Sequence, residues 1–128
     1  MTEPATPVTE EEILAFVRAS LASVWELELL LLLYRSPQRH WDAKEIDRQL
    51  RASETVVAYA LRRLRVAGLV AETTKDRFQY RPGLPRLHAI VQALEIAYRT
   101  NPISVVKVIL GAPDSNLRIF SEAFRLKE

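Results

Sequence analysis

Apolar residues recur three and four positions apart along most of this chain of 128 residues, which is the spacing of one face of an α-helix. Thr9 is placed as the N-cap of a first helix, and Ser23 as the N-cap of a second helix that runs to Tyr34. The second helix is apolar on most of its sides, so we expect it to be the most buried helix of the fold. Leu, Ala, Glu and Arg are abundant and Gly is rare, which also favours helices.

The middle of the chain predicts two short helices in succession. Asp42 and Glu45 have the spacing of a capping box, in which each side chain accepts a hydrogen bond from the backbone of the other. Ser53 is the expected N-cap of the following helix, which carries inward apolar positions and runs to about Ala67. Gly68 is expected to end this helix, because glycine adopts positive φ at little cost.

A hairpin and further helices are expected after Gly68. Residues 69–72 and 78–81 read as short strands around a polar turn at 74–76. Three helices are then expected, at 84–99, 101–109 and 114–126. The resulting organisation is a flexible tail, an N-terminal helix, a middle domain and a C-terminal helical extension, at residues 1–8, 9–22, 23–83 and 84–128.

Charge is distributed unevenly along the chain, although the formal net charge is only +2. Residues 1–34 contain one basic and six acidic residues, whereas residues 35–86 contain twelve basic and six acidic ones. Affinity for a polyanion depends on clustered cations rather than on total charge. The middle segment therefore has the balance of a phosphate-binding surface, and an ordinary solvated face accounts for the charges equally well.

Several classes of function find no support in the sequence. There is no cysteine, so no disulfide or thiolate metal site is possible, and His40 and His88 are the only imidazoles. No phosphate-binding loop, nucleophile elbow or zinc-protease motif occurs, so we expect neither enzyme activity, nor a metal site, nor a cofactor. The longest apolar run, Leu29 to Tyr34, is too short to cross a bilayer, and the acidic start is unlike a signal peptide. We therefore expect a cytoplasmic protein.

The middle segment resembles the helix-turn-helix and wing of bacterial winged-helix transcriptional regulators. The resemblance is broadly to the MarR and ArsR types and covers roughly residues 24–82. Its residues are Asp42-Ala-Lys-Glu-Ile-Asp-Arg-Gln-Leu50 and Ser53-Glu-Thr-Val-Val-Ala-Tyr-Ala-Leu-Arg-Arg-Leu-Arg-Val-Ala-Gly-Leu-Val70, of which the stretch from Leu61 to Val70 is the strongest part. The resemblance implies a mainly α winged helix-turn-helix fold, with a three-helix core, a small β-wing and flanking N- and C-terminal helices.

The same resemblance implies binding of double-stranded DNA, with residues 53–67 as the recognition helix and 69–81 as the wing. The candidate contact residues are Lys44, Arg51, Ser53, Thr55, Val56, Tyr59, Arg62, Arg63, Lys75 and Arg77. The outward face departs from the usual pattern, because Thr55 and Tyr59 are the polar side chains placed to read base edges near the helix start. Val56 and Ala58 are instead suited to thymine methyl groups.

Two further expectations concern partners. The apolar stripes of the flanking helices exceed what one small domain needs, which indicates a homodimer through those helices. An adaptor that binds another protein of the transcription apparatus, through the surface of Val56, Ala58 and Tyr59 or through the C-terminal helices, is the alternative to a DNA-binding regulator. Replacement of Arg62 or Arg63 by alanine is expected to weaken DNA binding without lowering the melting temperature.

Overall fold

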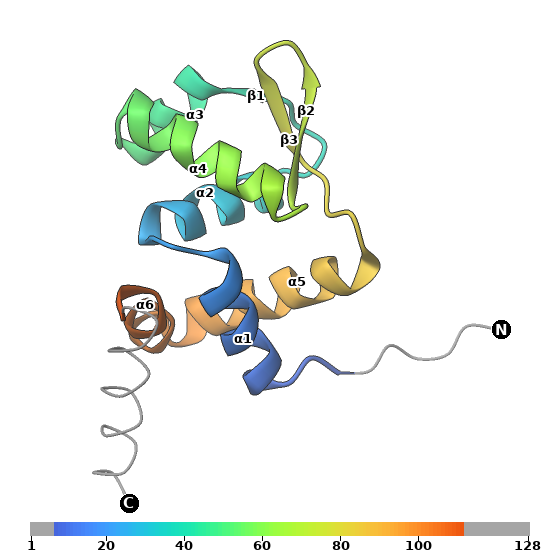
Figure 1. Ribbon diagram of the computed structural model, residues 1–128, viewed down its shortest axis with the longest axis vertical. Coiled ribbons are helices and arrows are strands. Elements are labelled where there is room, and N and C mark those ends of the chain that lie inside the picture. Colours follow the sequence, from blue (N-terminus) through green and yellow to red (C-terminus); the bar gives the residue numbers. More distant parts are fainter. Residues whose placement is uncertain (1–6, 112–128) are drawn as a thin grey trace, which may run out of the picture.

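The computed structural model describes residues 7–111 and is shown in Figure 1. Within this range the chain forms six helices and a small three-stranded sheet. In chain order the elements are α1 (Glu10–Ser20), α2 (Val24–Arg35), β1 (Trp41–Asp42), α3 (Ala43–Leu50), α4 (Glu54–Val66), β2 (Val70–Thr74), β3 (Arg77–Tyr80), α5 (Pro85–Thr100) and α6 (Pro102–Leu110). The helix expected at 114–126 and most of the tail expected at 1–8 lie outside the described residues.

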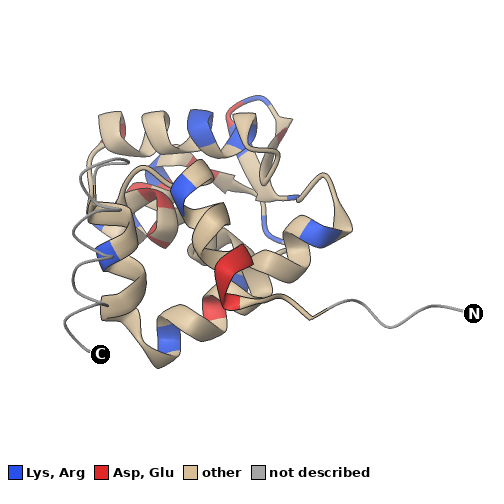
Figure 2. Cartoon of the chain, turned by 60° about the horizontal axis from the view of Figure 1, so that its bottom comes forward, with Lys and Arg blue, Asp and Glu red and all other residues tan. Residues whose placement is uncertain are grey.

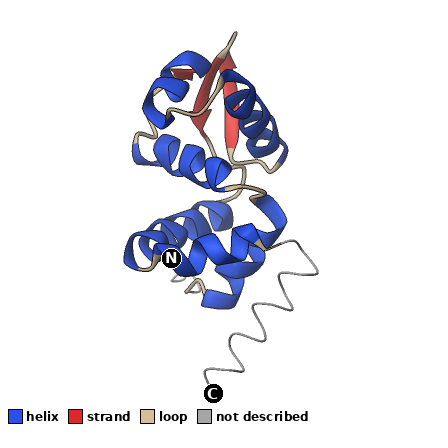
Figure 3. Cartoon of the chain, turned by 90° about the vertical axis from the view of Figure 1, so that its left-hand side faces the viewer, coloured by secondary structure: helices blue, strands red, loops and turns tan. Residues whose placement is uncertain are grey.

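The elements form two halves that meet at α2. One half contains the sheet with α3 and α4, and the other contains α1, α5 and α6, as Figure 3 shows. Helix α2 contacts α3, α4 and β3 on one side and α5 and α6 on the other. The prediction of a winged-helix core with flanking helices is therefore confirmed.

Helix α2 owes its central place to its leucines. Leu27, Leu29, Leu30 and Leu33 are completely buried, and Leu31 is nearly so. Full burial of one such side chain contributes about 1.5–3 kcal/mol, so a helix that is apolar on most sides is most stable between two layers. The prediction that this helix is the most buried is confirmed.

The predicted N-caps set the starts of the first four helices. The side-chain oxygens of Thr9, Ser23, Asp42 and Ser53 each accept a hydrogen bond from a backbone N–H three residues further on. At α3 the capping box is complete, because the Asp42 carboxylate accepts from the Glu45 N–H at 2.8 Å and the Glu45 carboxylate from the Asp42 N–H at 3.0 Å. These caps satisfy N–H groups that the helices leave unpaired.

Gly68 ends α4, as predicted, and sets the direction in which the chain enters the hairpin. Its φ is +78°, in the left-handed region. The Gly68 N–H donates to the carbonyl of Arg65, and the Leu69 N–H to that of Leu64, both at 3.0 Å. This double closure is the Schellman arrangement, and it turns the chain directly from α4 into β2.

The sheet is antiparallel, with β3 in the middle and β1 and β2 on either side. The predicted hairpin is present, but β2 extends two residues further than expected and β3 begins one residue earlier. Asp76 makes the tight turn possible with a φ of +62°. Strand β1 was not predicted, because two residues leave no alternating pattern in a sequence.

Candidate nucleic-acid interface

Helix α4 divides into an inward and an outward face. Its inward side chains, Val57, Ala60, Leu61 and Leu64, are buried against neighbouring elements. Its exposed residues are Glu54, Thr55, Ala58, Tyr59, Arg62, Arg65 and Val66. With 3.6 residues per turn, Thr55 and Arg62 lie near the middle of the exposed arc. Helix α4 contacts α2, α3 and β2, so these elements fix which face reaches solvent.

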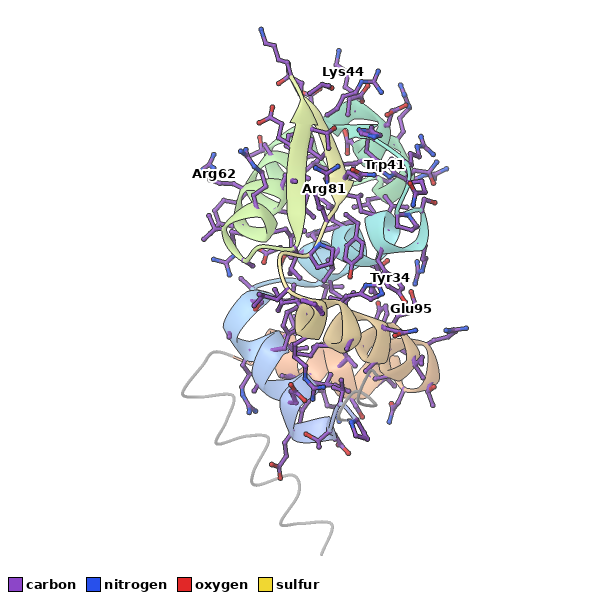
Figure 4. The ribbon with its side chains drawn as sticks, turned by 90° about the vertical axis from the view of Figure 1, so that its right-hand side faces the viewer. Tyr34, Trp41, Lys44, Arg62, Arg81 and Glu95 are labelled. Carbon is purple, nitrogen blue, oxygen red and sulfur yellow. The ribbon has the colours of Figure 1, made fainter. Side chains whose placement is uncertain are left out.

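A groove lies beside this outward face, between α4, the start of α3 and the hairpin. It encloses about 530 Å³ and is lined by Asp42, Ala43, Lys44, Ala58, Leu61, Arg62, Arg65, Asp76 and Phe78. Basic side chains come from two helices: Lys44 from the first turn of α3, and Arg62 and Arg65 from α4. Figure 4 shows Arg62 pointing outward from α4 and Lys44 near the tip of the hairpin. The groove thus combines three cations with two carboxylates, Asp42 and Asp76, and with apolar side chains.

Most of the predicted basic contact residues carry charges that no acid of the described chain neutralises. Within residues 7–111 no ion pair involves Lys44, Arg51, Arg62, Lys75 or Arg77, and all five side chains are exposed. Figure 2 shows basic positions along α4 and at the hairpin tip. Unpaired cations on one side of a domain can contact phosphates without first breaking an internal ion pair.

The hairpin tip holds two of these cations in a fixed turn. Lys75 and Arg77 flank Asp76, whose backbone N–H donates to the Glu72 carboxylate at 2.9 Å. Glu72 also forms an ion pair of 3.5 Å with Arg65. The acids of the hairpin therefore shape the turn and engage Arg65, and they form no ion pair with Lys75 or Arg77 within the described chain.

Arg63 differs from its neighbour Arg62. Its Nε lies 3.0 Å from the carboxylate of Glu26 on α2, and Glu26 is only 1% exposed. The hydrogen bond and the charge of Glu26 raise the pKa of the Arg63 guanidinium above its ordinary value. The guanidinium thus fastens α4 to α2, and we remove Arg63 from the set of proposed DNA contacts.

This pair was not predicted, because Glu26 has the spacing of an ordinary capping residue after Ser23. In the structure the Glu26 carboxylate accepts from the Ala22 N–H at 2.9 Å and from Arg63, rather than completing a box with Ser23. The helical position of Arg63 was the available signal. It lies at the edge of the exposed arc of α4, on the side that packs against α2.

The remaining predicted residues lie close to the start of α4. Thr55 and Tyr59 are exposed on the outward face, whereas Val56 is half-buried at its edge. The Ser53 Oγ accepts a hydrogen bond from the Val56 N–H at 3.2 Å, so this hydroxyl caps the helix while its proton stays available to a phosphate. Arg51 is the C-cap of α3, and its backbone has a left-handed conformation with a φ of +56°.

Sequence reasoning missed Arg65, which lines the groove from the last turn of α4. Its guanidinium carbon lies 6.0 Å from the centre of the Phe78 ring, and it reaches Glu72 on β2. The motif contained this arginine, but the hairpin residues that surround it come from another part of the sequence. Its place in the groove depends on tertiary structure.

The helices of the other half hold several of their charges in internal pairs. Arg35 of α2 donates to Glu95 of α5 at 2.7 Å, and Arg86 of α5 donates to Glu12 of α1 at 2.8 Å. The hydrogen bond from Arg86 lowers the pKa of Glu12. These pairs join helices to one another, whereas Lys44, Arg62 and Lys75 have no ion pair within residues 7–111.

The two histidines have separate partners. His40 Nδ1 lies 2.6 Å from the Thr73 hydroxyl, and His88 Nδ1 lies 2.9 Å from that of Tyr80. Among residues 7–111 no group of three or more His, Cys, Asp or Glu side chains is arranged to hold a metal ion. No helix in this part of the chain is long and apolar enough to span a membrane.

Comparison with known proteins supports the fold. No protein-family model and no curated protein sequence matches the chain. Among solved structures, the chain is similar to the MarR family protein Rv2887 of Mycobacterium tuberculosis, with a TM-score of 0.53 and 21% sequence identity. The match covers 92% of this chain and 84% of that chain. It therefore includes the flanking helices as well as the helix-turn-helix and wing, and the chain has a winged-helix fold similar to that of a MarR family protein.

Proposed function

We propose that the chain is a transcriptional regulator that binds duplex DNA, with the helix at 53–67 in the major groove and the wing at 69–81 on the adjacent backbone. The observation that carries this proposal is a set of five exposed cations that have no ion pair within residues 7–111 and that lie on α3, on α4, in the turn between them and at the hairpin tip: Lys44, Arg51, Arg62, Lys75 and Arg77. A helix that projects from a compact domain beside a basic hairpin has the form of winged-helix DNA readers. The similarity to a MarR family protein supports the same function.

The cations have separate roles in this proposal. Lys44 and Arg51 lie at the two ends of α3, where phosphate contacts set the register of the domain. Arg62 lies on the outward face of α4 and contacts a phosphate, or a guanine where the helix enters deeply. Lys75 and Arg77 at the hairpin tip contact the minor groove or its backbone.

A homodimer completes the proposed arrangement. Ile96 on α5 and Ile103 and Leu110 on α6 are between 55% and 71% exposed, in the half of the molecule that lies away from the wing. A second copy packed on this surface places two recognition helices about one DNA turn apart, so the target is a near-palindrome. Sedimentation of the full chain tests the dimer.

DNA affinity measured at two salt concentrations tests the function. Fluorescence anisotropy with a random-sequence duplex gives the dissociation constant at about 50 mM and about 200 mM salt. Five phosphate contacts predict a loss of affinity of about 500-fold over this range when one copy binds, and a dimer with both copies on DNA is expected to lose more. A chain that does not bind duplex DNA at the lower salt contradicts the proposal.

One observation favours the alternative of a protein-binding adaptor. Tyr59 and Val66 on α4 are 53% and 85% exposed, and they lie seven residues apart on the same side of the helix. Neighbouring exposed apolar groups are typical of surfaces that bind another protein. Absence of DNA binding together with capture of a component of the transcription apparatus supports the adaptor.

A further inference from the structure

The part of α4 that faces the proposed DNA site has an unusual composition for a base reader. Its exposed residues after Glu54 are Thr55, Ala58 and Tyr59, followed one turn later by Arg62. The exposed residues of α4 include no Asn or Gln, and Glu54 is the one acidic residue among them. The neighbouring helix α3 differs, because its exposed positions are Lys44, Arg48 and Gln49. The outward face of α4 therefore offers methyl groups and a ring where α3 offers polar groups.

The chemistry of the major groove identifies what such a face can recognise. Adenine, guanine and cytosine present hydrogen-bonding groups there, whereas thymine also presents the apolar C5 methyl group. The sequence pattern suggested Val56 and Ala58 for such contacts, but Val56 is half-buried at the edge of the face. Thr55 and Ala58 are exposed, each carries a methyl group, and they lie three residues apart on one side of the helix. Neither residue contributes to the buried core of the domain.

We infer that α4 selects DNA by contact of Thr55 and Ala58 with thymine methyl groups, with Arg62 at the far end of the same short stretch. From Thr55 to Arg62 the helix rises about 10 Å at 1.5 Å per residue, so the three side chains lie within two turns of the outward face. The expected target is thus a half-site whose thymine methyl groups face the first two turns of α4 in the major groove. This inference rests on the proposed function, because it assigns the DNA sequence class read by the same face.

Removal of the methyl group alone tests the inference. The probes are two duplexes of about 24 base pairs, alternating dA-dT and alternating dA-dU, which have the same phosphates and differ in the C5 methyl. A buried methyl contributes about 0.8 kcal/mol, which is a factor of about four in affinity. The full chain is therefore expected to bind the dA-dT duplex at least about four-fold more tightly, as measured by anisotropy at low salt.

Two variants locate the contact on the helix. In Thr55→Ser with Ala58→Ser both methyl groups are replaced, and the hydroxyl at position 55 remains. This variant is expected to bind the two duplexes equally. The matched control is Val66→Ser, which removes an apolar side chain that is 85% exposed in the last turn of α4 and is expected to leave the preference unchanged.

The possible outcomes distinguish a failure of this inference from a failure of the proposed DNA binding. Equal affinity of the unmodified chain for the two duplexes overturns the inference and leaves DNA binding in place. A preference that persists in the Thr55 and Ala58 variant, or that disappears in the Val66 variant, overturns the assignment to the first turns of α4. No binding to either duplex overturns the proposed function as well.

Discussion

Two adjacent arginines on α4 have opposite surroundings. Arg62 is exposed on the face that borders the groove, and it has no ion pair within the described chain. Arg63 lies at the edge of the exposed arc, where it meets the buried carboxylate of Glu26. The sequence presents the two arginines as one basic pair, yet the 100° between neighbouring residues of a helix gives one of them an internal partner and leaves the other facing solvent.

The comparison shows what makes a basic helix an interface. A cation can contact a phosphate readily when it has no ion pair with an acid of its own chain. Helix α4 has within one turn an arginine with such a pair, Arg63, and one without a pair in the described chain, Arg62. The inward face of the helix fixes its orientation through Arg63 and the buried apolar residues. The outward face is then presented at a constant angle, which a reader of base edges needs.

The largest effect on stability is expected for Arg63→Ala. The substitution leaves the buried Glu26 carboxylate without its charged partner. Because the Arg63 side chain is itself 35% exposed, the expected cost is about 2 kcal/mol, below that of breaking a fully buried pair. Urea denaturation measures the loss. Replacing both residues by leucine is expected to restore most of the stability, because no isolated charge then remains buried. If Arg63→Ala unfolds at the same urea concentration as the unmodified chain, Arg63 does not fasten α4 to α2.

Arg62→Ala is expected to have the reverse profile. The melting temperature stays within the range of an ordinary surface substitution, and affinity for duplex DNA falls about ten-fold, or about 1.4 kcal/mol. Anisotropy and thermal melts measure the two quantities on the same preparation. The matched control is Arg18→Ala on α1, an exposed arginine of the other half, which is expected to bind DNA like the unmodified chain. Equal weakening by Arg18→Ala contradicts an interface on α4.

A contact in the other half of the molecule gives a smaller effect that depends on pH. The Tyr98 hydroxyl donates to Glu28 at 2.5 Å, and this hydrogen bond raises the pKa of Tyr98 from 10.0 to about 12. Because the folded pKa is the higher one, the contact contributes fully below pH 10 and is lost as the pH rises through 12.

Tyr98→Phe is therefore expected to lower stability by on the order of 1 kcal/mol at neutral pH and to flatten the loss of stability in the alkaline range. Denaturant melts over a series of pH values measure both effects, and DNA affinity is expected to stay unchanged. An unaltered alkaline profile in Tyr98→Phe shows that another group dominates the alkaline unfolding.

The smallest effect is expected for Lys75→Ala at the hairpin tip. A single phosphate contact changes affinity little for any one sequence, but the slope of log affinity against log salt falls by about one per copy. The measurement is a salt titration on several unrelated duplexes, which are expected to weaken equally. Loss of affinity for one sequence alone indicates that Lys75 contacts a base instead.

Local signals in the sequence were sufficient for most of the fold. Helix starts at Thr9, Ser23, Asp42 and Ser53 follow from side chains that bond to the backbone three residues away, and such contacts need no knowledge of the rest of the chain. The end of α4 follows from the tolerance of Gly68 for positive φ in the same way.

The parts that the sequence did not reveal depend on long-range contacts. Strand β1 exists because Trp41 pairs with Phe78, and the groove exists because the start of α3 lies near the hairpin. The role of Arg63 depends on a carboxylate 37 positions earlier in the chain. A single sequence contains no signal for such pairs, so candidate site residues chosen by motif include Arg63, which has an internal partner, together with arginines that have no ion pair in the part of the chain that the structure describes.

The central claim is that duplex DNA lies against the outward face of α4 and the hairpin tip. A titration of the isotopically labelled full chain with a duplex of about 24 base pairs, followed by backbone amide NMR, tests it directly. The account predicts that the largest shifts fall in residues 53–66 and 74–77, with α1 and the middle of α5 nearly unchanged. Shifts centred on α1, α5 or α6, or no shifts at low salt, contradict it.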